Sequence, residues 1–301
     1  MDARLVDEIV ACLPQGRTCF NYYPERYAWL LLRHVVGDGM TVGALKQGPF
    51  AGLLQKPRVK QWLARLGSDR ICTGDLIAAD GDAGQLMFTL TLSQWHGTQT
   101  TRGKANLVLQ LNFDRGHDQL YQRLVKPQQA GVGPFAYSSH PIHCGGRNTL
   151  AWARLDIDLD AGEVLIEEIQ NDWLRKAAWA LAHPGRWSPQ IGGESADVLR
   201  YLHWLQARYC KVWAEAMLAA VVWFSREELG LTRLFYHSPE SNVQLKKLPV
   251  HHQPPRSLYT DLPKQFCFRA SGTMPRFLVG KRGKAVRNAP LYELRLERGV
   301  A

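Results

Sequence analysis

Residues 164–173 read Val-Leu-Ile-Glu-Glu-Ile-Gln-Asn-Asp-Trp, and we interpret this stretch as the β-strand around which the fold is built. Successive side chains of a strand point to opposite faces, so Val164, Ile166 and Glu168 are expected on one face. Glu167 is expected on the other face, again between aliphatic neighbours. Because apolar neighbours mark a side that faces the core, we predict that Glu168 lies on a central strand, shielded from solvent.

More strands are predicted on both sides of this stretch. Residues 150–157 alternate in the same way, and the sequence Asp-Leu-Asp-Ala-Gly at 158–162 predicts a hairpin that joins them to residues 163–169. Upstream, two segments rich in β-forming residues are separated by a polar loop at 96–103. The further strands that these patterns predict are 86–93, 105–113 and 231–237.

Helical periodicity is found before and after these strands. Residues 1–84 contain apolar residues at helical spacing and predict a mainly helical N-terminal segment. One long helix is predicted over 196–229, with Gly230 as the residue that ends it. Residues 85–301 then form a mixed α/β core with a basic C-terminal tail, and the two parts are expected to make one compact unit.

The expected fold class is therefore α/β of the α+β kind, with a mostly antiparallel mixed sheet flanked by helices and a helical N-terminal segment. Hydrophobic residues make up 46% and charged residues 21% of the 301 residues, which is typical of a globular chain and excludes disorder as its main state. The net charge of +10 favours anionic partners.

Cellular location can also be predicted from composition. The longest apolar stretches, such as 214–224, are too short to span a bilayer, so no membrane association is expected. The first residues lack the features of a signal peptide. The six cysteines form no CxxC pair, so reduced thiols and a cytoplasmic location are expected.

Glu168 is the main candidate for chemistry. Burial disfavours an ionised carboxylate, which suits a glutamate to act as a general acid or base. Two structural explanations stay open beside this one. The residue lies on an edge strand with a solvated face, or it is paired with a buried arginine.

The segment 165–173 resembles the "IEEIQSDW" core of a domain found in very large polyvalent proteins of phages and mobile elements. Residues 149–156 are similar to the strand before that core, and the helix that begins at Trp213 is similar to its helix. The resemblance covers roughly residues 135–268. The chain departs from it at Asn171, where the family has Ser, and at Leu174-Arg175, where the family has His-Gln. It implies a phage or mobile-element origin without a defined activity.

The order of strand, long helix, strand, Asn and Tyr is also similar to the second half of a GNAT-type acyltransferase. This resemblance implies that Glu168 is the base, that Asn242 supports a splayed backbone, and that Tyr259 protonates the leaving thiolate. The family's acyl-CoA pyrophosphate lies in a Gln/Arg-x-x-Gly-x-Gly/Ala loop after the central strand. Here the glycines come later and at another spacing, so the cofactor-binding candidates are Gln170, Gln190, Gly192 and Gly193.

The rival interpretation is a non-enzymatic protein that binds nucleic acid, another polyanion or a protein partner. From Lys264 onward the tail holds nine basic residues against Glu293 and Glu297. Such a surplus favours phosphate contacts. The sequence His140-Pro-Ile-His-Cys144 offers three metal ligands without a clear fourth, so no metal site is predicted. The candidates for nucleic-acid binding are Lys281, Arg282, Lys284 and Arg287.

Overall fold

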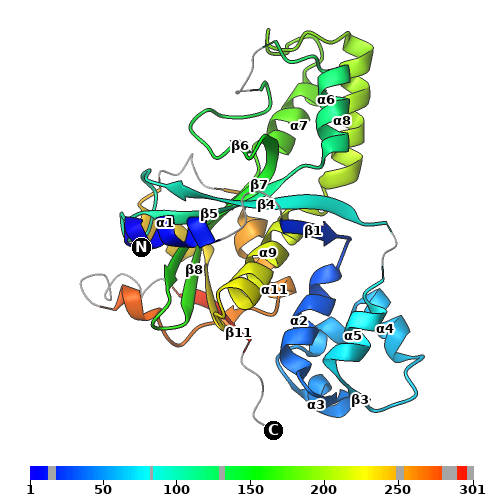
Figure 1. Cartoon of the computed structure of the whole chain (residues 1–301), viewed down its shortest axis with the longest axis vertical. Helices are drawn as coiled ribbons and strands as arrows, with labels where there is room; N and C mark the ends of the chain where they lie inside the picture. The colour runs from blue at the N-terminus through cyan, green and yellow to red at the C-terminus, as the bar shows by residue number, and fades with distance from the viewer. Residues whose placement is uncertain (13–17, 82–83, 129–132, 249–253, 280–289, 297–301) are drawn as a thin grey trace.

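The computed structural model describes residues 1–12, 18–81, 84–128, 133–248, 254–279 and 290–296. Within this part of the chain, helices flank a nine-stranded sheet (Figure 1). Its strands are β1 (Thr18–Tyr22), β4 (Leu86–Trp95), β5 (Asn106–Asn112), β6 (His143–Cys144), β7 (Arg147–Asp158), β8 (Glu163–Gln170), β9 (Arg233–His237), β10 (Arg269–Ala270) and β11 (Leu291–Arg295).

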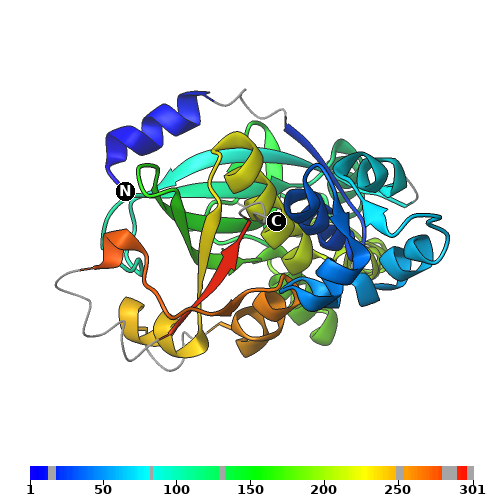
Figure 2. The ribbon, with the colours of Figure 1, turned by 90° about the horizontal axis from the view of Figure 1, so that it is seen from below.

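The strand order is β1-β4-β5-β7-β8-β9-β11-β10, with β6 paired to β7. All of these pairs are antiparallel except β8 and β9, which run parallel. The α+β class and the mostly antiparallel sheet predicted from the sequence are therefore confirmed. Figure 2 shows β11, in red, beside β9, in yellow. This strand was not expected, because residues 291–295 lie in the segment that we interpreted as a basic tail.

Most of the described helices lie in two groups. Helices α2 to α5 lie together in the lower right of Figure 1, and α6 to α8 lie together at its top. None of the helices in the described ranges is long and apolar enough to cross a membrane. The helices are α1 (Ala3–Cys12), α2 (Arg26–Val36), α3 (Val42–Gln47), α4 (Pro57–Leu63), α5 (Thr73–Ala79), α6 (Arg115–Leu124), α7 (Trp173–Ala182), α8 (Ser195–Tyr209), α9 (Trp213–Trp223), α10 (Pro239–Lys246) and α11 (Asp261–Gln265).

The N-terminal part is mainly helical, and it also contributes to the sheet. β1 pairs with β4 at the edge of the sheet, and α2 packs on α9. Glu215 on α9 accepts a hydrogen bond from the Tyr22 hydroxyl at 2.6 Å and another from the backbone N–H of Glu25. Two buried polar contacts thus connect the first helical region to the central helix. A separate two-stranded sheet, β2 (Met40–Thr41) with β3 (Arg70–Ile71), lies between the short helices.

The single long helix predicted over 196–229 is wrong. The chain breaks at 210–212 into α8 and α9, and α9 continues as a π-helical turn at Phe224–Glu228. The break has a packing reason, because α8 packs on α6 and α7, whereas α9 packs on β5, β7 and β8. One straight helix cannot direct its apolar residues to both places. The predicted end is confirmed, because Gly230 follows the helix with a φ of 67°.

The predicted hairpin of β7 and β8 is confirmed and contains a β-bulge. Arg154 pairs with Glu168 and Leu155 pairs with Ile166, so Glu167 has no partner on β7. An extra residue reverses the alternation of side chains beyond it. Val164 and Ile166 therefore share the main core with Ile169, while Glu168 lies on the opposite face beside Arg154. The prediction that Glu168 shares a face with Val164 and Ile166 is wrong for this reason.

The predicted position of Glu168 is confirmed despite this reversal. Its strand has β7 on one side and β9 on the other, and its side chain is only 15% exposed. Its carboxylate accepts a hydrogen bond from Arg154 on the neighbouring strand.

Candidate functional site

The parallel strands β8 and β9 separate at one point, which we call the fork. Their pairing runs from Glu163 with Arg233 to Ile166 with Tyr236, whereas β8 continues to Gln170. Beyond Ile166, no strand of the described part of the chain pairs with this edge of β8. The bulge residue Glu167 lies at the start of this gap. Bulges of this kind commonly re-aim side chains beside active sites.

The carboxylate of Glu167 is wholly buried and has three partners. Its Oε1 accepts from the Thr101 backbone N–H at 2.9 Å, and its Oε2 accepts from the Thr101 hydroxyl at 2.8 Å. His237 Nε2 lies 3.3 Å away and Lys246 Nζ 3.9 Å away, and Lys246 also donates to the Glu167 backbone carbonyl. Burial alone raises the pKa of Glu167, but the His237 hydrogen bond and the Lys246 charge outweigh it and lower this pKa to about 2.

His237 connects this carboxylate to Ser241. Burial lowers the pKa of His237 despite the neighbouring carboxylate, so the ring is neutral at pH 7. The neutral ring then donates from Nε2 to Glu167 and accepts at Nδ1 from the Ser241 hydroxyl, 3.1 Å away. Burial lowers the pKa of Lys246 to about 8.

The order Ser241, His237, Glu167 is that of a nucleophile, a base and an orienting carboxylate. However, Ser241 is fully buried, and its side chain also caps the start of α10 through Ser238. The Ser241 hydroxyl is thus already engaged in the cap of this helix. We therefore interpret the cluster as a support that fixes the ends of β8 and β9.

Glu168 faces a second polar group at the fork. Arg154 donates to its carboxylate and also to the backbone carbonyls of Thr98 and Gln99, both at 3.1 Å. The guanidinium carbon lies 4.9 Å from the centroid of the Trp95 ring. The pairing with a buried arginine, which the sequence left open as a structural explanation, is therefore present.

Two tyrosines of the main core, Tyr236 and Tyr259, are within electrostatic reach of Glu168. The rings of Tyr236 and Tyr259, the latter in a short 3-10 helix at Arg256–Tyr259, have centroids 5.6 Å apart. Both hydroxyls are buried without a hydrogen-bond partner among the described residues. Burial raises the pKa of both tyrosines, and the Glu168 charge raises it further. The structure thus brings the predicted residues Glu168 and Tyr259 into one electrostatic neighbourhood.

Asn242 lies in α10, which directly follows β9. Its backbone N–H donates to the Ser238 carbonyl, as expected in a helix. Its side chain is buried, and Oδ1 has no hydrogen-bond partner among the described residues. This is the position after the second parallel strand that the acyltransferase resemblance implies. No contact of its side chain with Glu168 or Tyr259 is found in the described structure.

The residues expected to bind a cofactor form hydrogen bonds within the protein. Gln170 donates to Asp172 at 2.9 Å, at the start of α7. The N–H of Gly192 donates to the Lys126 carbonyl, and that of Gly193 donates to the Val125 carbonyl at 2.9 Å.

Close packing explains these glycines better than phosphate binding does. A Cβ on Gly193 would lie 2.0 Å from the backbone oxygen of Leu124. The neighbouring Gln190 also pairs through its backbone, accepting from the N–H of Gln128. At the start of α7, where an N-terminus can hold phosphate, the Asp172 carboxylate and the Asn171 side chain are already present. These residues do not fit a pyrophosphate group.

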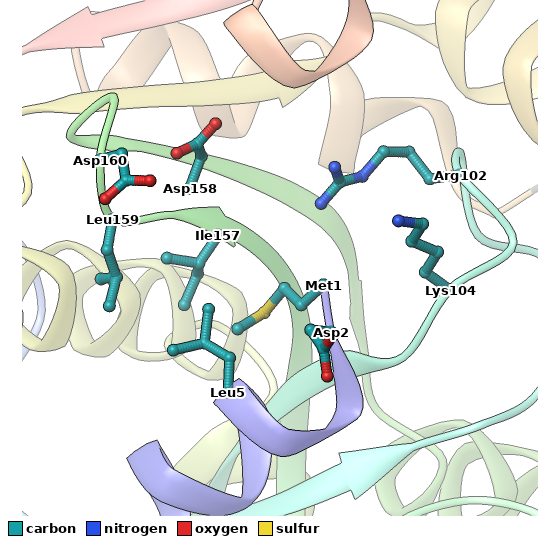
Figure 3. Close-up of a pocket in the computed structure, with 9 residues that line it drawn as sticks. All are labelled: Met1, Asp2, Leu5, Arg102, Lys104, Ile157, Asp158, Leu159 and Asp160. Atoms are coloured by element: carbon teal, nitrogen blue, oxygen red, sulfur yellow. The ribbon is translucent and has the colours of Figure 1, made fainter.

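A separate cavity of about 350 Å³ lies between α1 and the turn of the β7–β8 hairpin (Figure 3). Arg102 lies at its edge and binds both oxygens of Asp156, so its charge is matched. Carboxylates and cations both line the rest, which favours neither sign of ligand charge. The lining residues are Met1, Asp2, Leu5, Arg102, Lys104, Ile157, Asp158, Leu159 and Asp160.

Two further predictions concern charge and metals. The basic residues Lys281, Arg282, Lys284 and Arg287 lie outside the described residues. Within the described ranges, no group of three or more His, Cys, Asp or Glu could hold a metal ion. His140, from the segment with metal-ligand residues, is instead 2.6 Å from the Asp172 carboxylate.

No family model, curated protein or solved structure matches this chain. The resemblance of residues 135–268 to the polyvalent-protein domain, and of the strand order to the acyltransferases, therefore stays an expectation from the sequence.

Sequence reasoning did not single out Arg154, His237 or Lys246. A signal for Arg154 was present, because an arginine inside a strand of buried aliphatic residues requires a carboxylate partner. His237, at the end of an apolar strand, gave a weaker signal of the same kind. Lys246 gave none, because a lysine near the end of a short helix is usually exposed.

Proposed function

We propose that this chain is a GNAT-like group-transfer protein of phage or mobile-element origin and that its reaction centre is the fork. One observation carries the proposal. The hydroxyls of Tyr236 and Tyr259 are buried without a hydrogen-bond partner among the described residues, within electrostatic reach of Glu168, where two parallel strands separate. Buried polar atoms without partners are rare, so two at one place favour a bound polar group.

The roles of the residues follow from their charge. Glu168 is an acceptor at the fork and takes the proton of an incoming amine or hydroxyl. Tyr259 stays protonated at neutral pH because burial raises its pKa, so it has a proton to donate. In an acyl transfer the nucleophile forms a bond to the acyl carbon, the bond to the leaving group breaks, and Tyr259 gives the leaving group its proton. Transfer of the proton from Glu168 to Tyr259 through solvent restores both residues.

The donor is expected to be a short acyl thioester. The residues at the loop that should hold the pyrophosphate of acyl-CoA do not fit it, because Asp172 is already at the start of α7 and the N–H groups of Gly192 and Gly193 are engaged. The fork thus represents a degenerate form of the acyltransferase arrangement. Its residues act on the acyl end of the donor, and the residues expected to hold the nucleotide end do not fit it.

The test compares two donors. S-acetyl-N-acetylcysteamine and acetyl-CoA are incubated with the chain and a panel of amines, and the released thiol is measured. We expect similar rates with both donors. Glu168→Gln should lower the rate about 10²- to 10⁴-fold, the range for removing a general base. Glu240→Gln is the control, because Glu240 is an exposed carboxylate of α10, at 51%.

Retention of full thiol release by Glu168→Gln and Tyr259→Phe would rule out the fork as the reaction centre. A strong preference for acetyl-CoA over the short thioester would instead show that the nucleotide end is recognised. Folding of each variant is checked by its urea midpoint. Tyr259→Phe removes a hydroxyl that has no hydrogen-bond partner among the described residues, so it should unfold at the same urea concentration as the parent.

A further inference from the structure

A second cavity, which we call the α7 pocket, is lined in part by residues of α7, which lies with α6 and α8 at one end of the molecule (Figure 1). It has a volume of about 350 Å³. Aromatic residues and two cations make up most of its wall, and none of the described residues that line it is acidic. The lining residues are Pro134, Phe135, Tyr137, Arg175, Lys176, Trp179, Ala180, Trp187, Ser188 and Ile191.

The aromatic side chains are unusually accessible. Six large hydrophobic side chains of the described residues are exposed, and two of them, Trp179 and Tyr137, line this one pocket. They are 52% and 42% exposed. Trp187 is held in place, since its indole N–H donates to the Ala180 carbonyl at 2.9 Å. Exposed aromatic side chains that cluster in a concave site mark a binding surface, whereas single exposed apolar side chains are common on protein surfaces.

The two cations, Arg175 and Lys176, are consecutive residues of α7. Lys176 Nζ is 3.9 Å from the centroid of the Tyr137 ring and donates to the Ala136 carbonyl. No carboxylate of the described residues lies within ion-pair distance of Lys176. Arg175 is 5.4 Å from the same ring and is bound on one side by Asp172 at 2.7 Å. Its guanidinium has five N–H donors, so the pair with Asp172 leaves others available.

We propose that the α7 pocket binds a nucleotide unit, with its base stacked on Trp179 and Tyr137 and its phosphate at Arg175 and Lys176. The aromatic rings of the wall match the base of this ligand, and the two cations match its phosphate. A simple anion would make no use of two exposed rings, and an apolar ligand would leave the cations unmatched. Every base presents a π-face that aromatic side chains can stack on, and Arg and Lys are the usual partners of phosphate.

The proposal is independent of the proposed reaction at the fork, because it rests on other residues. Trp179 is expected to affect nucleotide binding and not thiol release, and Glu168 the reverse. The nucleotide unit has two sources, a free nucleotide and a residue of a single-stranded nucleic acid. Their shared chemistry is a base with its phosphate, and the test separates them.

The experiment measures the fluorescence anisotropy of a labelled twelve-residue single-stranded DNA with the full chain. Trp179→Ala should weaken binding about 5- to 150-fold, the range for loss of one stacking partner. Trp179→Phe should restore much of it. Ile77→Ala is the matched control for the loss of an exposed apolar side chain, since Ile77 on α5 is 56% exposed. Arg200→Gln controls for Arg175→Gln, because both arginines form i,i+3 pairs with an Asp.

Competition by AMP and by inorganic polyphosphate identifies the source. Displacement of the DNA by millimolar AMP assigns the pocket to a free nucleotide as well. DNA binding that neither AMP nor polyphosphate displaces assigns it to a strand, and AMP binding without DNA binding assigns it to a free nucleotide alone. One phosphate at Arg175 and Lys176 should give a log–log salt slope of about −0.7 on single strands.

Three results would overturn the proposal. The first is that neither DNA nor AMP binds. The second is that Trp179→Ala binds as well as Ile77→Ala does. The third is that polyphosphate displaces the DNA while adenosine and AMP do not, which would mean that charge alone is recognised. Thiol release by Trp179→Ala should equal that of the parent chain, so failure here and failure of the fork as a reaction centre are distinguishable.

Discussion

The fork and the α7 pocket involve the two ends of one continuous segment, residues 163–182. The charged side chains of these two regions differ in burial and in pairing. At the fork, Glu167 and Lys246 are buried and matched by partners inside the protein. In the pocket, Trp179 and Arg175 are exposed, and the nearby Lys176 has no carboxylate partner among the described residues. The difference separates groups that hold the chain together from groups that are free to bind something else.

The first prediction concerns the buried carboxylate. Glu167→Ala leaves Lys246 and His237 buried without their partner, so the free energy of unfolding should fall by about 3 to 5 kcal/mol. Urea unfolding measures this loss. Glu240→Ala breaks the exposed pair with Arg256 and should change the same quantity by less than about 0.5 kcal/mol. Equal effects of the two substitutions would contradict the division between the two regions.

The second prediction compares two tryptophans of the same helix. Trp173 is buried, and its indole N–H donates to the Tyr201 hydroxyl at 2.7 Å, whereas Trp179 faces the pocket. Trp173→Ala should destabilise the chain by about 3 to 5 kcal/mol. Trp179→Ala should change stability by no more than about 0.5 kcal/mol. A large loss for Trp179→Ala in thermal or urea unfolding would make its ring part of the core instead.

The third prediction is that the fork makes the protein sensitive to acid. The pKa of Glu167 is about 2 in the folded state against 4.5 ordinarily, so its contribution is complete above pH 4.5 and is lost as the pH falls toward 2. This loss amounts to about 3 kcal/mol, because one pKa unit is worth about 1.4 kcal/mol. The pKa of His237 is also lowered, so its contribution starts to fall below pH 6.5.

Urea unfolding between pH 7 and pH 3 tests this expectation. Glu167→Gln should remove the steep decline below pH 4.5 and leave the shallower one that begins near pH 6.5. A free energy of unfolding that stays constant, or rises, as the pH falls would mean that the carboxylate is not ionised in the folded protein.

The smallest expected effect is on stability at the pocket's arginine. Arg175→Gln and Arg200→Gln each break one ion pair between neighbouring helical residues, and the two side chains are 58% and 66% exposed. Both should change the free energy of unfolding by less than about 0.5 kcal/mol. Nucleotide binding should distinguish them, because only Arg175 lines the pocket. A loss of binding with Arg200→Gln would point to long-range charge rather than to a site.

Local signals predicted much of the fold. The hairpin between β7 and β8 follows from the turn sequence at 158–162, and the end of the helix follows from Gly230. The break at 210–212 could not be predicted in this way, because both halves have helical sequences and only packing on different elements separates them. The edge strand β1 was missed because five residues give too short a pattern.

The candidate site was predicted less completely. Glu168 and Tyr259 could be chosen from the sequence, and they do share a neighbourhood. The partners of Glu167 could not be chosen, because Thr101 and Lys246 are 66 and 79 residues away and come from a loop and a helix that carry no periodic signal. The α7 pocket was missed for a similar reason, since its wall combines a loop at 133–137 with residues of α7 and the segment after it.

The extra residue in β8 has a consequence for protein engineering. Residues 163–166 place their even-numbered side chains in the main core, whereas Ile169, an odd-numbered residue, belongs to the same core beyond Glu167. A designer who applied one alternating pattern to the whole strand would direct half of it to the wrong side. A replacement sequence for β8 therefore needs two hydrophobic patterns in opposite phase, joined at one buried acid.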